Sequence, residues 1–135
     1  MSNLKHSVLL LVLSLSLGSC ADILRDDIST MESVAHLSAD ELISGLEANE
    51  NFYKEEILSV KGALVEVNTK NDHVNFLIKG NTIENHYIIC EMNHSFELQD
   101  NHFLPGETVK VKGILKGYLN DVVLLNCVLD NTDKE

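Results

Sequence analysis

Basic residues, aromatic residues and prolines are all scarce in this sequence, and tryptophan is absent. Ten Lys and Arg stand against 21 Asp and Glu, which gives a formal net charge of −11. Proteins bind the phosphate backbone of nucleic acids mainly through Lys and Arg that displace counterions, so this balance predicts no nucleic-acid partner. Because aromatic residues make up only 5% of the chain, we expect a core built mainly from Val, Leu and Ile.

The sequence also lacks a hydrophobic stretch long enough to cross a bilayer, which takes about 20 residues in a helix. The longest apolar run, Val8 to Leu17, has ten residues. Even so, 44% of the residues are hydrophobic and 23% are charged, a composition that favours a folded core over disorder. At 135 residues the chain has room for one domain.

The N-terminus has the order of segments that is typical of an export signal. Lys5 gives a weakly basic start, the apolar run follows, and two small residues precede Cys20. The segment Leu17-Gly18-Ser19-Cys20 resembles the lipobox of bacterial lipoproteins, whose cysteine receives a diacylglyceryl group before cleavage makes it the mature N-terminus. The alternative is an ordinary secretory signal in which the cysteine is incidental.

The lipobox resemblance and the acidic segment without a clear period that follows Cys20 together predict three parts of the chain. We expect a lipoprotein signal peptide at residues 1–19, a lipidated Cys20 with an acidic tether at residues 20–37, and a folded domain at residues 38–135. The lipid would join the protein to a membrane of the cell envelope, and we expect the periplasmic side of the outer membrane. Without the signal, 9 basic residues remain against 21 acidic ones, a net charge of −12.

One short helix is predicted at the start of the folded domain. Ser38 and Glu41 have the spacing of a capping box, in which each side chain satisfies a free backbone donor of the first helical turn. Leu42, Ile43 and Leu46 then recur at helical spacing. The helix should end near the asparagines at residues 49–51.

Beyond the helix, the hydrophobic period changes to two, which predicts strands. Val60 and Val65 differ by an odd number of positions, so we expect a β-bulge at Gly62 to keep both on one face. The five predicted strands are Ile57–Val67, His73–Lys79, Glu84–Glu91, Thr108–Leu115 and Asp121–Leu129. Five short strands, two of them bent at glycine, can close into a small barrel without exposed edges.

Several segments resemble a known family. The segments are Val60-Lys61-Gly62, Pro105-Gly106-Glu107-Thr108-Val109 and Gly117 to Leu124. They resemble the OB-fold lipoproteins, also called tRNA anticodon-binding-like proteins, over about residues 38–129. The resemblance implies an all-β fold with a small helical content, a five-stranded OB barrel preceded by one short helix. These are motifs of a fold without catalytic content, so we take the fold from them and not the ligand in the family name.

Two cysteines remain once Cys20 is acylated. In the strand order that the resemblance implies, Cys90 on the third strand and Cys127 on the fifth are on neighbouring strands, which allows a disulfide in an oxidising compartment. The alternative is two free, buried thiols that act as small hydrophobic side chains. A thiol-dependent enzyme would need one of them reduced and exposed.

Other chemistry finds little support in the sequence. The spacing of His86, Cys90 and His94 puts them on one face of a strand, but across roughly 27 Å, too far apart to share one metal ion. No nucleophile elbow, HExxH motif or Gly-rich phosphate loop is present. We therefore expect no metal, no cofactor and no enzymatic activity.

The expected function is binding. OB barrels commonly bind on the face around their second and third strands, which here carries the polar or aromatic candidates Asn75, Lys79, His86 and Tyr87. We expect a membrane-anchored interaction module for a protein, peptide or glycan of the cell envelope. The alternative is a structural or stress-tolerance component of an envelope assembly with no small ligand.

Overall fold

The computed structural model describes residues 27–98 and 102–131. The predicted signal peptide and Cys20 lie outside the described residues. The elements within them are the 3-10 turn η2 (Ile28–Thr30), β1 (Ala35–Ser38), α2 (Ala39–Ala48), β2 (Ile57–Lys70), β3 (His73–Lys79), β4 (Ile88–Met92), β5 (Thr108–Tyr118) and β6 (Val122–Leu129).

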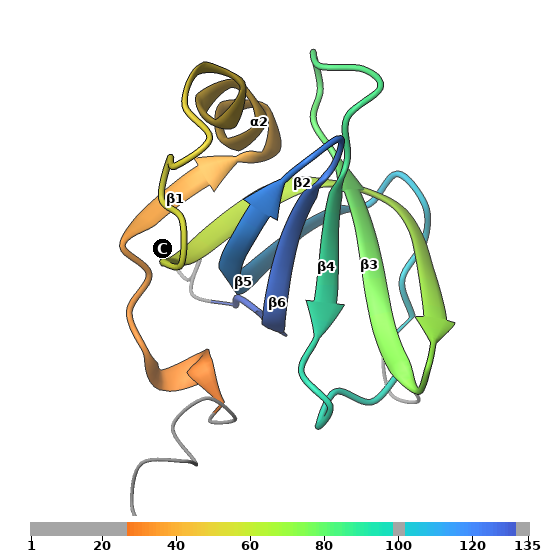
Figure 1. Cartoon of the computed structure of the whole chain (residues 1–135). Coiled ribbons are helices and arrows are strands. Elements are labelled where there is room, and N and C mark those ends of the chain that lie inside the picture. Colours follow the sequence, from red (N-terminus) through yellow and green to blue (C-terminus); the bar gives the residue numbers. More distant parts are fainter. Residues whose placement is uncertain (1–26, 99–101, 132–135) are drawn as a thin grey trace, which may run out of the picture.

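The strands form a closed barrel (Figure 1). The sheet order is β1-β2-β3-β4-β6-β5, and an additional pairing of β2 with β5 closes it. The long strand β2 makes this closure possible, because its first half pairs with β5 from Ile57 to Ala63 and its second half pairs with β3 from Ala63 to Lys70. The prediction of a five-stranded OB-type barrel with one helix is confirmed.

Helix α2 closes one end of the barrel (Figure 1). It begins where the capping pattern predicts, since Ser38 Oγ accepts a hydrogen bond from the Glu41 backbone N–H at 3.1 Å. Leu42, Ile43 and Leu46 are at most 2% exposed and join the barrel core. Burying each of these side chains contributes at most about 2 kcal/mol to the stability of the fold. The helix is therefore held by packing more than by the intrinsic helix propensity of its residues.

Aromatic side chains from the segment between β4 and β5 also cover the core. Phe76 on β3 makes edge-to-face contacts with Phe96 and Phe103, at centroid distances of 5.6 and 4.9 Å. OB folds usually carry a helix in this connection, and its described parts, 93–98 and 102–107, contain none. In these described parts, phenylalanine packing covers the core.

The bulge in β2 lies later than predicted. The register shifts between Leu64 and Glu66, not at Gly62. Gly62 serves close packing instead: a Cβ atom there would lie 2.4 Å from Ile78 Cγ2 and 2.7 Å from the Lys79 carbonyl oxygen. The glycine is thus needed because the neighbouring strand approaches closely, a requirement that the alternation of residues in one strand does not reveal.

The predicted tether is partly structured, which corrects the expectation of an irregular segment up to residue 37. Within its described part, Ile28–Thr30 forms η2 and Ala35–Ser38 forms β1, which pairs in parallel with Leu58 to Lys61 of β2. Four residues are too few to show a hydrophobic period, and the strand forms because the edge of β2 offers free backbone groups. In the described ranges, no helix is long and apolar enough to span a bilayer.

Candidate ligand groove

The β2–β3 hairpin brings polar side chains together on the outside of the barrel. Its two-residue turn, Asn71-Asp72, has φ values of 53° and 64°, the left-handed conformation that asparagine and aspartate tolerate best. This turn fixes the register, so Lys70 pairs with His73, and two positions further Asn68 pairs with Asn75. Side chains two residues apart share a face, so the hairpin presents all four on the face opposite the core.

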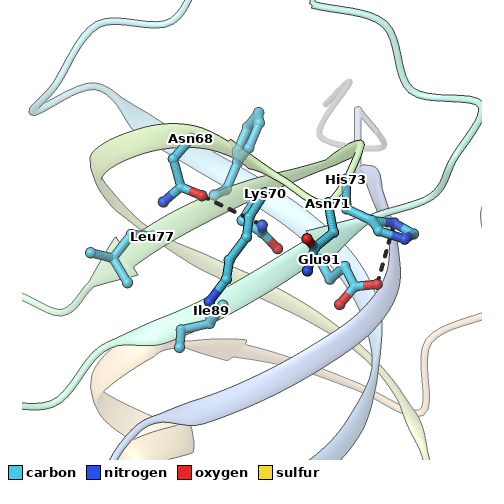
Figure 2. A pocket seen from close by; sticks show the side chains of 9 residues that line it. Asn68, Lys70, Asn71, His73, Leu77, Ile89 and Glu91 are labelled. Atoms are coloured by element: carbon cyan, nitrogen blue, oxygen red, sulfur yellow. Dashed lines mark hydrogen bonds and ion pairs between the residues drawn. The ribbon is translucent and has the colours of Figure 1, made fainter.

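A hollow of about 320 Å³ lies on this face (Figure 2). Leu77 of β3 and Ile89 of β4 are cross-strand partners, half-buried, and form its apolar floor. Three asparagines, a lysine, a histidine and a glutamate surround this floor. The residues lining the hollow are Asn68, Lys70, Asn71, His73, Asn75, Phe76, Leu77, Ile89 and Glu91.

The polar groups of the hollow are linked to one another but remain accessible. His73 Nδ1 lies 3.4 Å from Glu91 Oε1, and these side chains are 45% and 40% exposed. Asn68 Oδ1 accepts a hydrogen bond from Asn75 Nδ2 at 3.4 Å. Pairs as exposed as these contribute little to stability, so a ligand can replace them at small cost.

A second hollow of about 290 Å³ continues the first across the barrel wall. The two share His73 and Glu91, and the second reaches Ile114 on β5 and Leu125 on β6, which are paired and half-buried. We call both hollows together the groove. It runs over β3, β4, β6 and β5, and polar residues border an apolar floor along its length.

Only one of the four predicted binding residues lines the groove. Asn75 does, whereas Lys79 is exposed at the end of β3 and does not line either hollow. His86 and Tyr87 lie outside the strand, because β4 begins at Ile88 and not at residue 84. Their binding role stays a prediction, now at a different place on the barrel.

His86 belongs to a cluster that joins α2 to the β5–β6 turn. Its Nδ1 lies 2.8 Å from the Asn120 carbonyl oxygen, and its Nε2 lies 3.4 Å from Glu47 Oε1. Tyr118 packs against the imidazole at a centroid distance of 5.9 Å. Burial raises the pKa of the Tyr118 hydroxyl, and the charge of Glu47 raises it further. These contacts give His86 a structural role at this end of the barrel.

Among the polar residues of the first hollow, the sequence analysis identified only Asn75 and missed five, namely Asn68, Lys70, Asn71, His73 and Glu91. The signal that identifies three of them is the Asn71-Asp72 dipeptide between two alternating segments, which is typical of a two-residue hairpin turn. That turn extends the first predicted strand from Val67 to residue 70 and places the new residues opposite His73 and Asn75.

Cys90 and Cys127 lie on the neighbouring parallel strands β4 and β6 and are both fully buried. Both are free thiols in the structure. Burial raises the pKa of the Cys127 thiol well above its usual value, and the adjacent Cys90 thiol raises it further. A thiol in this setting is a poor nucleophile. The disulfide between the two stays a prediction.

Metal-binding residues do not gather in the part of the chain that the structure describes. No group of three His, Cys, Asp or Glu side chains there is arranged to hold a metal ion. His86 lies at the α2 end of the barrel with Glu47, whereas His94 lines the groove.

The family model tRNA_anti-like matches residues 4–129, which is almost the whole chain. The chain belongs to the tRNA_anti-like family. This membership accords with the closed barrel and helix α2, and the fold that the resemblance implied is thereby confirmed.

Membership in the tRNA_anti-like family contradicts one expectation. We predicted no nucleic-acid partner from the net charge, and a family named for its likeness to tRNA anticodon-binding domains overturns that exclusion. The physical reason is that net charge is a sum over the whole chain, whereas binding depends on the charges of one face. In the groove, Lys70 and Lys116 balance Glu55 and Glu91, so the groove is not the acidic surface that the sum suggested.

Other comparisons are distant. A chain in the crystal structure of the S. pombe Stn1-ten1 complex matches at 13% identity with a TM-score of 0.38, covering 52% of this chain and 53% of that one. The match thus spans about half of each protein. No curated protein matches the tRNA_anti-like chain described here.

Proposed function

We propose that the chain is an exported lipoprotein, acylated at Cys20, whose OB barrel is a binding module of the cell envelope. The proposal rests on two independent features. The first is the order of basic residue, apolar run, small residues and cysteine at the N-terminus. The second is the groove on the outer wall of the barrel.

The chemistry of the groove favours a polar ligand with little net charge, such as an oligosaccharide or an extended peptide. Asn68, Asn71 and Asn75 each offer an amide donor and an acceptor, and Leu77 and Ile89 supply an apolar floor. Specific small ligand sites typically combine such a floor with a few convergent polar groups, in volumes from about 300 Å³ upward. This amide-lined hollow is the observation that carries the proposal.

A second candidate ligand is single-stranded nucleic acid, and membership in the tRNA_anti-like family favours it. The two candidates differ in their response to salt. Binding to phosphates through Lys70 weakens steeply as salt rises, because counterions are released on binding. Binding of a neutral ligand through the asparagines depends little on salt.

The proposed role is binding without catalysis. The residues that line the first hollow include no serine, threonine or cysteine, so no side-chain nucleophile of these types faces a ligand there. The remaining alternative is a component that fills a place in an envelope assembly without a small ligand. A groove that binds nothing of any class favours that alternative.

The test is a binding screen of the purified full chain with its groove variants. The probes are envelope-type oligosaccharides, short peptides, and single-stranded DNA and RNA oligomers at two salt concentrations. We expect saturable binding of one class, and the double variant Asn68→Ala, Asn75→Ala should weaken it about tenfold or more, since each hydrogen bond contributes about 1 kcal/mol.

The matched control is Lys79→Ala. Lys79 is exposed and lies on β3, the strand of Asn75, but outside the groove, so this change should leave binding unchanged. Binding that survives the double asparagine substitution, or that falls equally in the Lys79 variant, contradicts the groove as the ligand site.

A further inference from the structure

Lys112 is buried although it points out of the barrel. Its neighbour Val111 on β5 faces the core, so strand alternation directs Lys112 to the outside. Lys112 is nonetheless only 6% exposed. Its Nζ donates hydrogen bonds to the backbone carbonyl oxygens of Ser29 at 3.2 Å and Met31 at 2.9 Å. A charged group is removed from water only where such partners replace the water, so the N-terminal segment is held here by specific bonds.

Ile28 is buried in the same place. It is 2% exposed but is not part of the barrel core, because η2 packs on β5 and β6 from the outside. The Ser29 amide donates to Asp27 Oδ1 at 2.9 Å, and the Val34 amide donates to the Ile57 carbonyl oxygen at 2.8 Å. We call residues 27–34 the strap. It is attached to the outer wall along its length and leads directly into β1.

The strap shortens the connection between the barrel and Cys20. Only residues 21–26 separate Cys20 from Asp27, and seven Cα-to-Cα steps span at most about 25 Å. A compact domain of about 100 residues has a radius of gyration near 13 Å, which corresponds to a sphere about 34 Å across. The connection is therefore shorter than the body it holds.

We propose that the strap sets the orientation of the barrel on the membrane, with the η2 end toward the lipid headgroups and the end formed by α2 and the β5–β6 turn away from them. Figure 1 shows η2 and α2 at opposite ends of the barrel. A link of about 25 Å cannot bring the far end of a body about 34 Å wide to the surface. This inference rests on the proposed acylation of Cys20.

Two exposed apolar residues provide matched reporters at the two ends. Val34 in the strap is 55% exposed, and Leu119 in the β5–β6 turn is 98% exposed. We would label Val34→Cys and Leu119→Cys separately in the lipidated full chain on phosphatidylcholine vesicles that carry a quencher on the headgroup. The label at residue 34 should be quenched severalfold more than the label at residue 119. Equal quenching of the two labels overturns the proposal.

Releasing the strap should remove the difference in quenching between the labels at residues 34 and 119. Lys112→Met removes both bonds from Nζ to the strap and should release residues 27–33, while the Val34 bond to Ile57 remains. The connection from Cys20 to the barrel then spans up to about 50 Å. Lys116→Met on the same strand breaks only an exposed pair with Glu55 and should keep the difference. Because a change at buried Lys112 can disturb folding, Ile28→Asp is the second variant, as it detaches the strap from outside the core. If neither Lys112→Met nor Ile28→Asp reduces the difference in quenching between the two labels, the strap does not orient the barrel.

Hydrogen exchange separates this proposal from the proposed function. In the full chain with Cys20→Ser, the amides of Met31 and Val34 should be protected, and Ile28→Asp should remove that protection. If these amides are protected but the unaltered chain does not bind vesicles, the docked strap is upheld and the lipid anchor is contradicted. Vesicle binding of an acylated chain whose strap amides exchange freely upholds the anchor and overturns the docked strap.

Discussion

Asp40 links two parts of the fold through a single carboxylate. It stands in the first turn of α2, and its oxygens accept hydrogen bonds from the backbone amides of Asn81, Thr82 and Ile83 at 2.9 to 3.3 Å. Gly80 makes this approach possible, because a Cβ atom there would lie 1.9 Å from Asp40 Oδ1. The β3–β4 connection is therefore held to the helix by one acidic side chain.

This arrangement predicts a pH-dependent stability. Desolvation alone would raise the pKa of Asp40, but the backbone hydrogen bonds from Ile83, Asn81 and Thr82 together lower it below its usual value. A lowered pKa in the folded state means that ionised Asp40 stabilises the fold above the pKa of the unfolded chain, about 3.9, and that this contribution is lost as the pH falls through the lower folded value.

The variant Asp40→Asn checks this expectation. At pH 7 the free energy of unfolding should fall by about 1 kcal/mol, because a neutral amide replaces a charged acceptor of three bonds. Between pH 4 and pH 2, roughly where aspartate titrates, the two proteins should converge in urea titrations. A constant difference down to pH 2 contradicts the role assigned to the carboxylate. Glu41→Gln, an exposed change in the same turn, is the control.

At the scale of elements, the β5–β6 pair depends on a glycine that allows close packing. A Cβ atom on Gly113 would lie 2.5 Å from Cys127 Sγ and 3.1 Å from Leu124 Cβ, whereas one on Gly117 meets nothing within 4 Å. Gly113→Ala should therefore destabilise the protein by about 1 to 3 kcal/mol through overpacking. Gly117→Ala should change stability by less than about 0.5 kcal/mol. Thermal unfolding of the two variants measures both effects, and equal stabilities contradict this account of the packing.

The elements also show how far the sequence predicts this fold. Helix α2 and the strand His73–Lys79 follow from local signals, a capping pair and a clean alternation, and the structure confirms both. The sequence analysis did not predict β1, and residues 84–87 of the strand predicted from Glu84 lie outside β4. β1 exists only through its pairing with β2, a backbone partner distant in the chain. Long-range pairing of this kind leaves no period in a segment of four residues.

The candidate site was predicted in part for the same reason. Asn75 was identified because it lies on a strand with a regular alternation, and it lines the groove. His86 and Tyr87 were assigned to the same face by extending β4 too far, and the fold places them in the loop before that strand. The turn at Asn71-Asp72 is a local signal, and it leads to the rest of the hollow once it is recognised.

At the scale of the whole molecule, total charge was a poor guide to partners, whereas the order of segments was a good guide to fold. The excess of acidic residues is spread over the chain, and the groove itself contains two lysines, two histidines, two glutamates and neutral amides. A sum of charges contains no information on where those charges lie. The closed barrel, in contrast, follows from the number and spacing of the strands, which are properties of the whole sequence.

The central claim, a barrel held at a membrane by a lipid on Cys20, is tested most directly by Cys20→Ser in cells. For the unaltered chain, we expect a mature product in the membrane fraction that begins at Cys20, needs detergent for release and carries the mass of attached acyl chains. Two or three such chains make the attachment effectively permanent. The serine variant should lack that mass and should not yield this product. If it instead remains in the pelleted membranes at the same size and with the same detergent requirement, the account is contradicted.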